Sequence, residues 1–251
     1  MFEDGLIPQE VKNEVRRLVD SGHEVMLATG RGAPITLPVI EKLDITPEYL
    51  VCANGAVILV RDDDEETGYR RAFVKTFDAR DLLISLMEQV PGGNFALEDE
   101  HGFLHFTKGF DYRGVTQSRK VSFDELLTVP ATRVIMVSDD HTSEEFTEIV
   151  AKMGMHEASY SVGWTAWLDI TPHGVNKATA LEQVRLSLGI EQENVFAIGD
   201  GRNDVEMLQW AAEHGRSAVM SSAPEEVKGH ASEITDELAK GGSAKFLASI
   251  S

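Results

Sequence analysis

The sequence has little cysteine, few positive charges and no long apolar run, and each shortage excludes a class of protein. Cys52 is the only cysteine in 251 residues, so neither an intrachain disulfide nor a thiolate zinc cluster can form. Lys and Arg number 23 against 42 Asp and Glu, and the formal charge of −19 would repel a nucleic-acid backbone. No segment approaches the roughly 18 apolar residues of a membrane span, and residues 1–4 lack the features of a signal peptide. We therefore expect a cytoplasmic protein that binds neither nucleic acid nor membrane.

Helices and strands alternate in the first 56 residues. Residues 8–21 place apolar side chains on one helical face and stop at Gly22, and residues 24–28 form a short apolar run that ends in a glycine turn. A second helix is expected over residues 36–43 and a second strand over residues 49–53, which would bury Cys52. This alternation predicts a Rossmann-like, doubly wound parallel sheet that gathers ligands at the carboxyl ends of its strands.

After Gly55 the pattern changes to paired strands, and it returns to α/β alternation at residue 176. In between, strands are expected over residues 57–61, 69–75, 95–98, 103–107, 133–137 and 164–170, with helices over residues 79–89 and 143–153. Beyond them follow a helix over residues 176–188, a strand over 195–198, a helix over 203–213 and a strand over 217–220. We therefore predict an α/β core domain made of residues 1–56 and 173–251, with an inserted α+β cap domain over residues 57–172.

The most informative stretch joins the expected strand 195–198 to the next helix. Gly199 and Asp200 follow four apolar residues, and Asn203 and Asp204 lie one helical turn further on. Two carboxylates at the end of a buried strand are hard oxygen ligands of the kind that Mg²⁺ takes together with water and phosphate. The alternative is an ordinary strand-to-helix turn in which Asp200 caps the helix and Asp204 lies in its first turn.

Two other segments carry groups that could hold an anion. Thr29, Gly30 and Arg31 follow a strand and offer a hydroxyl, backbone amides and a guanidinium, although a plain β-to-α turn has the same pattern. Lys177 lies at the start of a helix, where its charge opposes the helix dipole. A lysine in that position is either aimed at a phosphate or simply solvated.

Taken together, the motifs occur in an order that resembles the haloacid dehalogenase superfamily, in particular its Cof-like subgroup with a type II cap. The matching segments span nearly the whole chain: Leu27-Ala28-Thr29-Gly30-Arg31, Asn54-Gly55-Ala56, Ile170-Thr171-Pro172-His173-Gly174-Val175-Asn176-Lys177, Gly199-Asp200-Gly201-Arg202-Asn203-Asp204 and Ala223-Pro224-Glu225-Glu226-Val227-Lys228. The resemblance implies a Mg²⁺-dependent phosphatase that hydrolyses a small phosphorylated metabolite through an aspartyl-phosphate intermediate.

The resemblance also implies roles for the matching residues. Those expected to be catalytic are Thr29, Lys177, Asp200 and Asp204; those expected to bind substrate are Thr29, Gly30, Arg31, Asn54, Lys177 and Asn203; and Asp200 and Asp204 are expected to bind Mg²⁺. A shared phosphate site requires Thr29, Lys177, Asp200 and Asn203 to converge in space.

One part of the family pattern has no counterpart. The Asp-x-Asp-Gly-Thr motif that carries the nucleophile would end the first, central strand and precede Gly5, but only Met1 to Asp4 stand there. Either an upstream strand and motif complete an active phosphatase, or the chain is a non-catalytic phosphate-binding or interaction protein. A dinucleotide-dependent oxidoreductase is disfavoured because no Gly-x-Gly-x-x-Gly follows a strand. If a central strand is missing, the strand ending at Ala28 and the strand ending at Ile198 should not pair directly.

Overall fold

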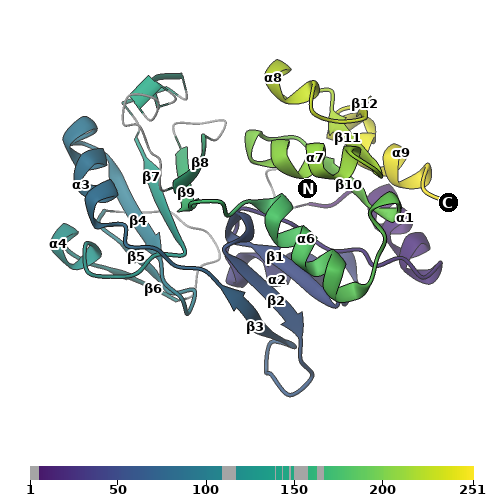
Figure 1. Ribbon diagram of the computed structural model, residues 1–251, viewed down its shortest axis with the longest axis horizontal. Helices are drawn as coiled ribbons and strands as arrows, with labels where there is room; N and C mark the ends of the chain where they lie inside the picture. The colour runs from purple at the N-terminus through teal and green to yellow at the C-terminus, as the bar shows by residue number, and fades with distance from the viewer. Residues whose placement is uncertain are drawn as a thin grey trace.

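The computed structural model describes residues 6–108, 117–138, 140–142, 144–146, 148–149, 158–162 and 167–251. Its strands form two three-stranded sheets and one six-stranded sheet. The six-stranded sheet lies on one side of the molecule and the two smaller sheets on the other (Figure 1). This arrangement is the predicted α/β core with an α+β insert.

The first small sheet contains β1 (Tyr49–Cys52), β2 (Val57–Arg61) and β3 (Tyr69–Val74) in antiparallel order. Leu50 and Cys52 pack toward helix α2 (Ala33–Leu43), and Val51 packs toward helix α6 (Lys177–Leu188), as the alternation of side chains along a strand requires. Strand β2 pairs with the core strand β1, and β3 pairs with β2, so both strands, which we expected in the cap, belong to the core sheet. The reason is the tight turn η1 (Ala53–Gly55), which reverses the chain directly after β1.

The second small sheet is parallel and contains β10 (Phe196–Gly199), β11 (Arg216–Met220) and β12 (Glu233–Thr235). Ala218 of β11 packs with helices α1 (Gln9–Asp20) and α9 (Gly242–Ala248) on one face. Val219 packs with α7 (Val205–Ala212) and α8 (Glu225–Lys228) on the other. Short 3₁₀ turns precede β10 at Gln192–Asn194, α7 at Arg202–Asp204 and α9 at Leu238–Lys240. Helices thus cover both faces, which confirms the doubly wound class.

No backbone hydrogen bond joins the two small sheets among the described residues. The run of residues 24–28 is extended, and only its end is bridged to β1, where Val51 donates to the Leu27 carbonyl and accepts from the Thr29 amide. The peptide groups of Ala28 therefore point away from β1. Residues 25–28 and 195–198, all of which the structure describes, share no backbone hydrogen bond. The prediction that these two segments are not direct partners is confirmed.

The six-stranded sheet has the order β6-β5-β4-β7-β9-β8. Its strands are β4 (Asn94–Glu98), β5 (Leu104–Phe106), β6 (Ser118–Lys120), β7 (Arg133–Val137), β8 (Ala158–Val162) and β9 (Trp167–Pro172). Helices α3 (Arg80–Gln89) and α4 (Phe123–Leu126) cover one face, where Leu83, Leu86, Phe95 and Leu126 are fully buried. The opposite face of β4, β7 and β9 is left to meet the core.

Two expected cap elements fall partly outside the described residues. These are the helix over residues 143–153 and the first part of the strand over residues 164–170. In the part of the chain that is described, no helix combines the length and the apolar character needed to cross a membrane.

Candidate functional site

Two loops meet at the carboxyl ends of the run 24–28 and of β1. The Asn54 amide donates to the Thr29 carbonyl over 3.0 Å, and the Ala53 amide donates to the Arg31 carbonyl over 2.9 Å. The Thr29 hydroxyl accepts from the Arg31 amide at 3.1 Å. A Cβ atom on Gly30 would lie 3.0 Å from the Asn54 side-chain oxygen, so glycine allows this close approach. The Thr29 loop is thus fixed against the Asn54 turn.

The Asn54 turn has an unusual backbone. Ala53, Asn54 and Gly55 all have positive φ values, of 48°, 51° and 101°. Asparagine and glycine tolerate this region, whereas alanine adopts it at a cost of about 1 kcal/mol. A Cβ atom on Gly55 would collide with the carbonyl of Asn176, so the turn is pressed against the start of α6. Strained non-glycine residues are concentrated at functional sites, which supports a role for this turn.

Helix α6 begins at this contact and presents Lys177. Asn176 caps the helix: its side-chain Oδ1 accepts from the Thr179 backbone amide at 2.9 Å, and its backbone amide donates to the Thr179 hydroxyl at 3.1 Å. Lys177 follows in the first turn and is buried, with its Nζ donating to Asp204 Oδ1 over 2.6 Å. The lysine is therefore held at the carboxylate that follows β10 and does not extend into solvent.

Asp204 organises the turn after β10. Its Oδ2 accepts from the Asp200 amide at 2.9 Å and from the Gly201 amide at 3.0 Å, while its Oδ1 accepts from Lys177. A Cβ atom on Gly199 would lie 2.6 Å from the Asp204 Cβ, which leaves room for glycine only. Asp204 thus lies in the first turn, as the ordinary-turn alternative expected, but Gly201 and not Asp200 is in the capping position.

Asp200 keeps an exposed side chain at the carboxyl end of β10. Partial burial and the Asp204 carboxylate raise its pKa, and Lys177 opposes that rise. Desolvation and a neighbouring like charge both disfavour the ionised form of a carboxylate. A hard cation beside Asp200 would relieve this repulsion.

The donor set fits Mg²⁺ when tested on the described residues. They contain no cluster of three or more His, Cys, Asp or Glu side chains that would form a complete protein cage. Mg²⁺ characteristically takes one or two carboxylates and completes its shell with water and phosphate. Asp200 has a carboxylate available for this, whereas the oxygens of Asp204 already accept three hydrogen bonds.

The two loop systems are joined by a pair of amide side chains. Asn203 Nδ2 donates to Asn54 Oδ1 over 2.9 Å, which connects the turn after β10 to the turn after β1. Through these contacts Thr29, Asn54, Lys177, Asn203 and Asp200 converge, as a shared anion site requires.

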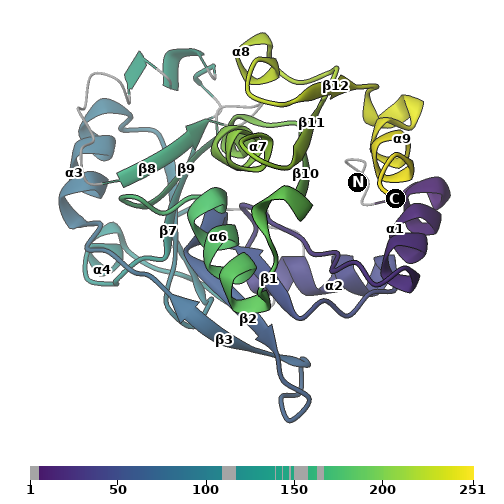
Figure 2. The same ribbon diagram turned by 45° about the vertical axis from the view of Figure 1, so that its right-hand side comes forward.

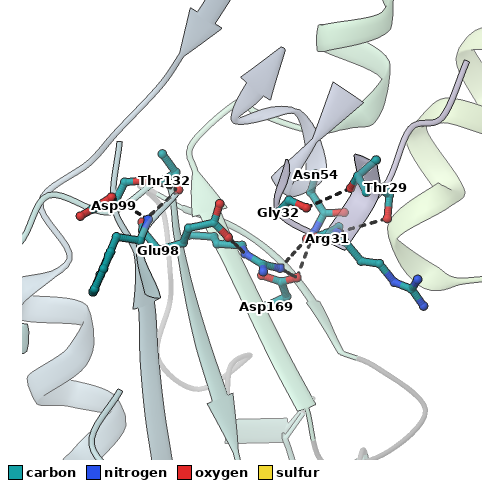
Figure 3. A network of polar contacts seen from close by, with 12 residues as sticks. Thr29, Arg31, Gly32, Asn54, Glu98, Asp99, Thr132 and Asp169 are labelled. Atoms are coloured by element: carbon teal, nitrogen blue, oxygen red, sulfur yellow. Dashed lines mark hydrogen bonds and ion pairs between the residues drawn. The ribbon is translucent and has the colours of Figure 1, made fainter. Parts of the chain in front are cut away.

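The cap contributes a buried charged group to the same region. Arg133 Nε donates to Glu98 Oε2 at 3.0 Å and its Nη1 donates to Asp169 Oδ2 at 3.4 Å. Asn54 Nδ2 also donates to Asp169 Oδ2, at 3.4 Å, so this cluster touches the core turn (Figure 3). Glu98, Arg133 and Asp169 were not among the residues predicted from the sequence, although a charged side chain inside an apolar strand is a signal that could have found them.

The sequence pattern of the haloacid dehalogenase-like hydrolases matches residues 1–247 of the chain. The chain belongs to this family.

Similar proteins agree with that assignment. The chain is 25% identical to the 5-amino-6-(5-phospho-D-ribitylamino)uracil phosphatase YitU of Bacillus subtilis, an alignment that covers 98% of this chain and 91% of YitU. It is 28% identical to the phosphatase YcsE of the same organism, with 98% and 89% covered. A solved structure of the HAD subclass IIB sugar phosphatase BT4131 shares the fold with a TM-score of 0.79 at 20% identity, over 96% of this chain and 91% of that one.

For this haloacid dehalogenase-like hydrolase, the expected residues are brought together with one exception. Arg31 has an exposed side chain, and in Figure 3 it points away from the Asn54 and Asp169 side chains. The loop conformation explains this, because Arg31 takes part in the Thr29–Asn54 contact through its backbone. The catalytic, substrate-binding and metal-binding roles of the individual residues remain predictions.

Proposed function

We propose that this hydrolase is a Mg²⁺-dependent phosphatase that acts on a small phosphorylated metabolite through an aspartyl-phosphate intermediate. The observation that carries the proposal is the convergence of Lys177, Asn203 and Asp200 with the Thr29 loop at one end of the core. In this proposal Asp200 holds the metal and Asp204 fixes Asp200 and Lys177. A cytoplasmic location fits such a substrate.

The electrostatics of the site support an anionic substrate even though the chain carries a formal charge of −19. Lys177 supplies a buried cation, and Mg²⁺ at Asp200 would supply further positive charge. Phosphoryl transfer is catalysed chiefly by positioning and by stabilising negative charge spread over the phosphoryl oxygens. In this proposal Thr29 and Asn203 donate hydrogen bonds to those oxygens, and Lys177 neutralises them.

The proposed place of the nucleophile lies between residues 25–28 and β10, which share no backbone hydrogen bond. Adjacent strands lie about 4.8 Å apart, so a single additional strand fits between two strands that are about 9–10 Å apart. We propose that the nucleophile belongs to a strand that lies between residues 25–28 and β10. Its carboxyl end would then carry an Asp-x-Asp-Gly-Thr motif beside Asp200 and Thr29. Unpaired buried peptide groups are costly, which favours a strand that pairs with the peptide groups of Ala28 facing away from β1.

The substrate class is a phosphorylated sugar, sugar alcohol or small phosphorylated acid. The names of YitU, YcsE and BT4131 describe phosphatases of a ribityl phosphate and of sugars, which supports the first two. Strands β4, β7 and β9 carry Glu98, Arg133 and Asp169 on the sheet face that lies toward the core. Cap side chains are thus available to contact the leaving group.

The test compares two chains. The 251-residue chain is expected to show almost no Mg²⁺-dependent hydrolysis of an aryl phosphate, and a version extended at the N-terminus by a strand with the Asp-x-Asp-Gly-Thr motif is expected to show it. Positioning groups alone recover only a small fraction of the rate when the nucleophile is absent. In the extended version, Asp200→Asn should abolish turnover, and Glu237→Gln, a distant surface change, should not.

Two outcomes would contradict the proposal. Robust turnover by the 251-residue chain that Asp200→Asn abolishes would mean that a different residue attacks phosphorus. An extended chain that binds phosphate and Mg²⁺ without turnover would favour the non-catalytic binding protein.

A further inference from the structure

We propose that Arg133 and Asp169 of the cap are positioning residues for the phosphate-binding loops, a proposal that rests on the proposed function. They belong to the cap sheet, and the loops that they contact belong to the core. Their part would be to hold the Gly30 carbonyl and the Asn54 amide in the orientation that phosphate binding requires.

The sheet register brings the charged residues together. Glu98 of β4 and Arg133 of β7 are direct cross-strand partners, and Asp169 of β9 is paired with Ile135, two residues further along β7 from Arg133. All three side chains lie on the sheet face opposite α3, because residues two apart in a strand share a face. Arg133 is almost fully buried, with 2% of its side chain exposed, so its guanidinium depends on protein acceptors.

The first link to the core is made by Arg133. Its Nη1 donates to the Gly30 carbonyl, in the loop that carries Thr29. Glycines permit the approach, because a Cβ atom on Gly32 would collide with the Glu98 carboxylate. A planar guanidinium can address three acceptors from three segments at once, which a lysine ammonium on its flexible stem does poorly.

The second link is made by Asp169. Its Oδ2 accepts from Asn54 Nδ2, and this contact fixes which way the Asn54 amide faces. With its NH₂ group turned to Asp169, Asn54 presents its oxygen to Asn203 Nδ2. A carboxylate can only accept, so it enforces this orientation, whereas an amide at position 169 could also donate and allow the Asn54 amide to reverse.

Burying these three charged side chains lowers the stability of the folded chain, which argues against a purely structural role. Asp169 Oδ1 is buried and has no hydrogen-bond partner among the described residues. Buried ion clusters are frequently matched or exceeded in stability by apolar residues of similar volume. The benefit of the cluster therefore lies in what it orients, which is the pair of loops that hold the predicted phosphate ligands.

The test uses the full 251-residue chain with three variants. Asp169→Asn and Arg133→Lys alter the two links to the core. Asp99→Asn is the matched control, because Asp99 follows β4 in the cap, pairs with His105 over 3.0 Å and makes no hydrogen bond to the core loops among the described residues. Each variant is measured by urea unfolding, by calorimetric titration with inorganic phosphate in Mg²⁺, and by amide hydrogen exchange at Ala53 and Asn54.

Asp169→Asn and Arg133→Lys are expected to weaken phosphate binding about tenfold, the equivalent of one oriented hydrogen bond. They should also speed exchange of the Ala53 and Asn54 amides in the phosphate-free protein. Asp99→Asn should change phosphate affinity by less than about twofold, even if it lowers the urea midpoint. Unchanged affinity and unchanged exchange in both link variants would overturn the positioning role.

The exchange measurement separates this inference from the proposed function. If the unmodified chain does not bind phosphate but the link variants still accelerate exchange at Ala53 and Asn54, the proposed function fails and the positioning of the loops stands. If the chain binds phosphate and the link variants behave like Asp99→Asn, the phosphate site of the proposed function stands and the positioning role fails.

Discussion

The buried ion pair between Lys177 and Asp204 leads to a quantitative prediction. Their side chains are 6% and 7% exposed, so neither charge is relieved by solvent when its partner is removed. Asp204→Ala would leave Lys177 as an uncompensated buried cation, and we expect it to lower the free energy of unfolding by about 3–5 kcal/mol. Lys177→Met leaves Asp204 with its two backbone donors and should cost less, about 1.5–3 kcal/mol.

A double-mutant cycle isolates the interaction between the two side chains. Asp204→Ala removes the acceptor of the Asp200 and Gly201 amides in both backgrounds, so that loss cancels in the cycle. The coupling energy that remains should be about 2 kcal/mol. Urea unfolding followed by circular dichroism, with the slope of the transition checked for each variant, supplies the four free energies.

The exposed pair Lys245 and Asp236 is the control for this cycle. Lys245 Nζ and Asp236 Oδ2 are 2.9 Å apart, close to the 2.6 Å between Lys177 Nζ and Asp204 Oδ1, but the two side chains are 68% and 48% exposed. Its coupling energy should stay below about 1 kcal/mol. A coupling of the Lys177 pair no larger than that of the Lys245 pair would refute the claim that burial makes this contact strong.

Three further predictions concern other buried positions. Burial, opposed by Arg133 and reinforced by Glu98, raises the pKa of Asp169 to about 6. The protonated side chain therefore contributes stability below about pH 4, and this contribution is lost as pH rises to about 6. Measured by urea unfolding, the stability of Asp169→Asn relative to the unmodified chain should increase by roughly 1–3 kcal/mol across that window, and a difference that does not change with pH would contradict the reasoning. Gly199→Ala should lower the urea midpoint by an amount equivalent to about 1–3 kcal/mol because its Cβ would overlap Asp204, whereas Gly229→Ala, with open space around its Cβ, should not. Burial raises the pKa of Cys52 to about 12, so a thiol reagent should label Cys52 only as fast as the chain unfolds, and rapid labelling of the native protein would show that β1 opens locally.

Local patterns were sufficient for the elements that end in strong signals. The helix predicted over residues 176–188 is confirmed as α6, which Asn176 caps and which Gly189 ends in the left-handed region. The helix predicted from residue 36 begins three residues earlier, at Ala33, because Pro34 is accommodated in its first turn.

Long-range pairing was harder to predict from the sequence. The strands over residues 57–61 and 69–75 were located correctly but expected in the cap, because a strand pattern does not specify its partner. Asn54-Gly55, a dipeptide that favours tight reversals, is the local signal that would have placed β2 beside β1. Short elements such as β6 and β12, with three residues each, carry too few residues to show a period.

The candidate site divides in the same way. Glycines and carboxylates that follow strands identified the core loops, because the end of each strand fixes where the next residues lie. Glu98, Arg133 and Asp169 come from three strands whose register cannot be read from any one of them. Their meeting depends on how the cap lies against the core, which a single sequence does not encode in a local pattern.

The cap is connected to the core by two crossings, one between β3 and α3 and the other between β9 and α6 (Figure 2). The second crossing is short, because Asp169 and Lys177 are only eight positions apart. A cap that swings open to release a product must separate Arg133 from the Gly30 carbonyl and Asp169 from Asn54, while the same motion pulls on the first turn of α6. Opening therefore has an electrostatic barrier of its own, and in enzymes where lid opening is slow it is product release, and not bond cleavage, that limits turnover.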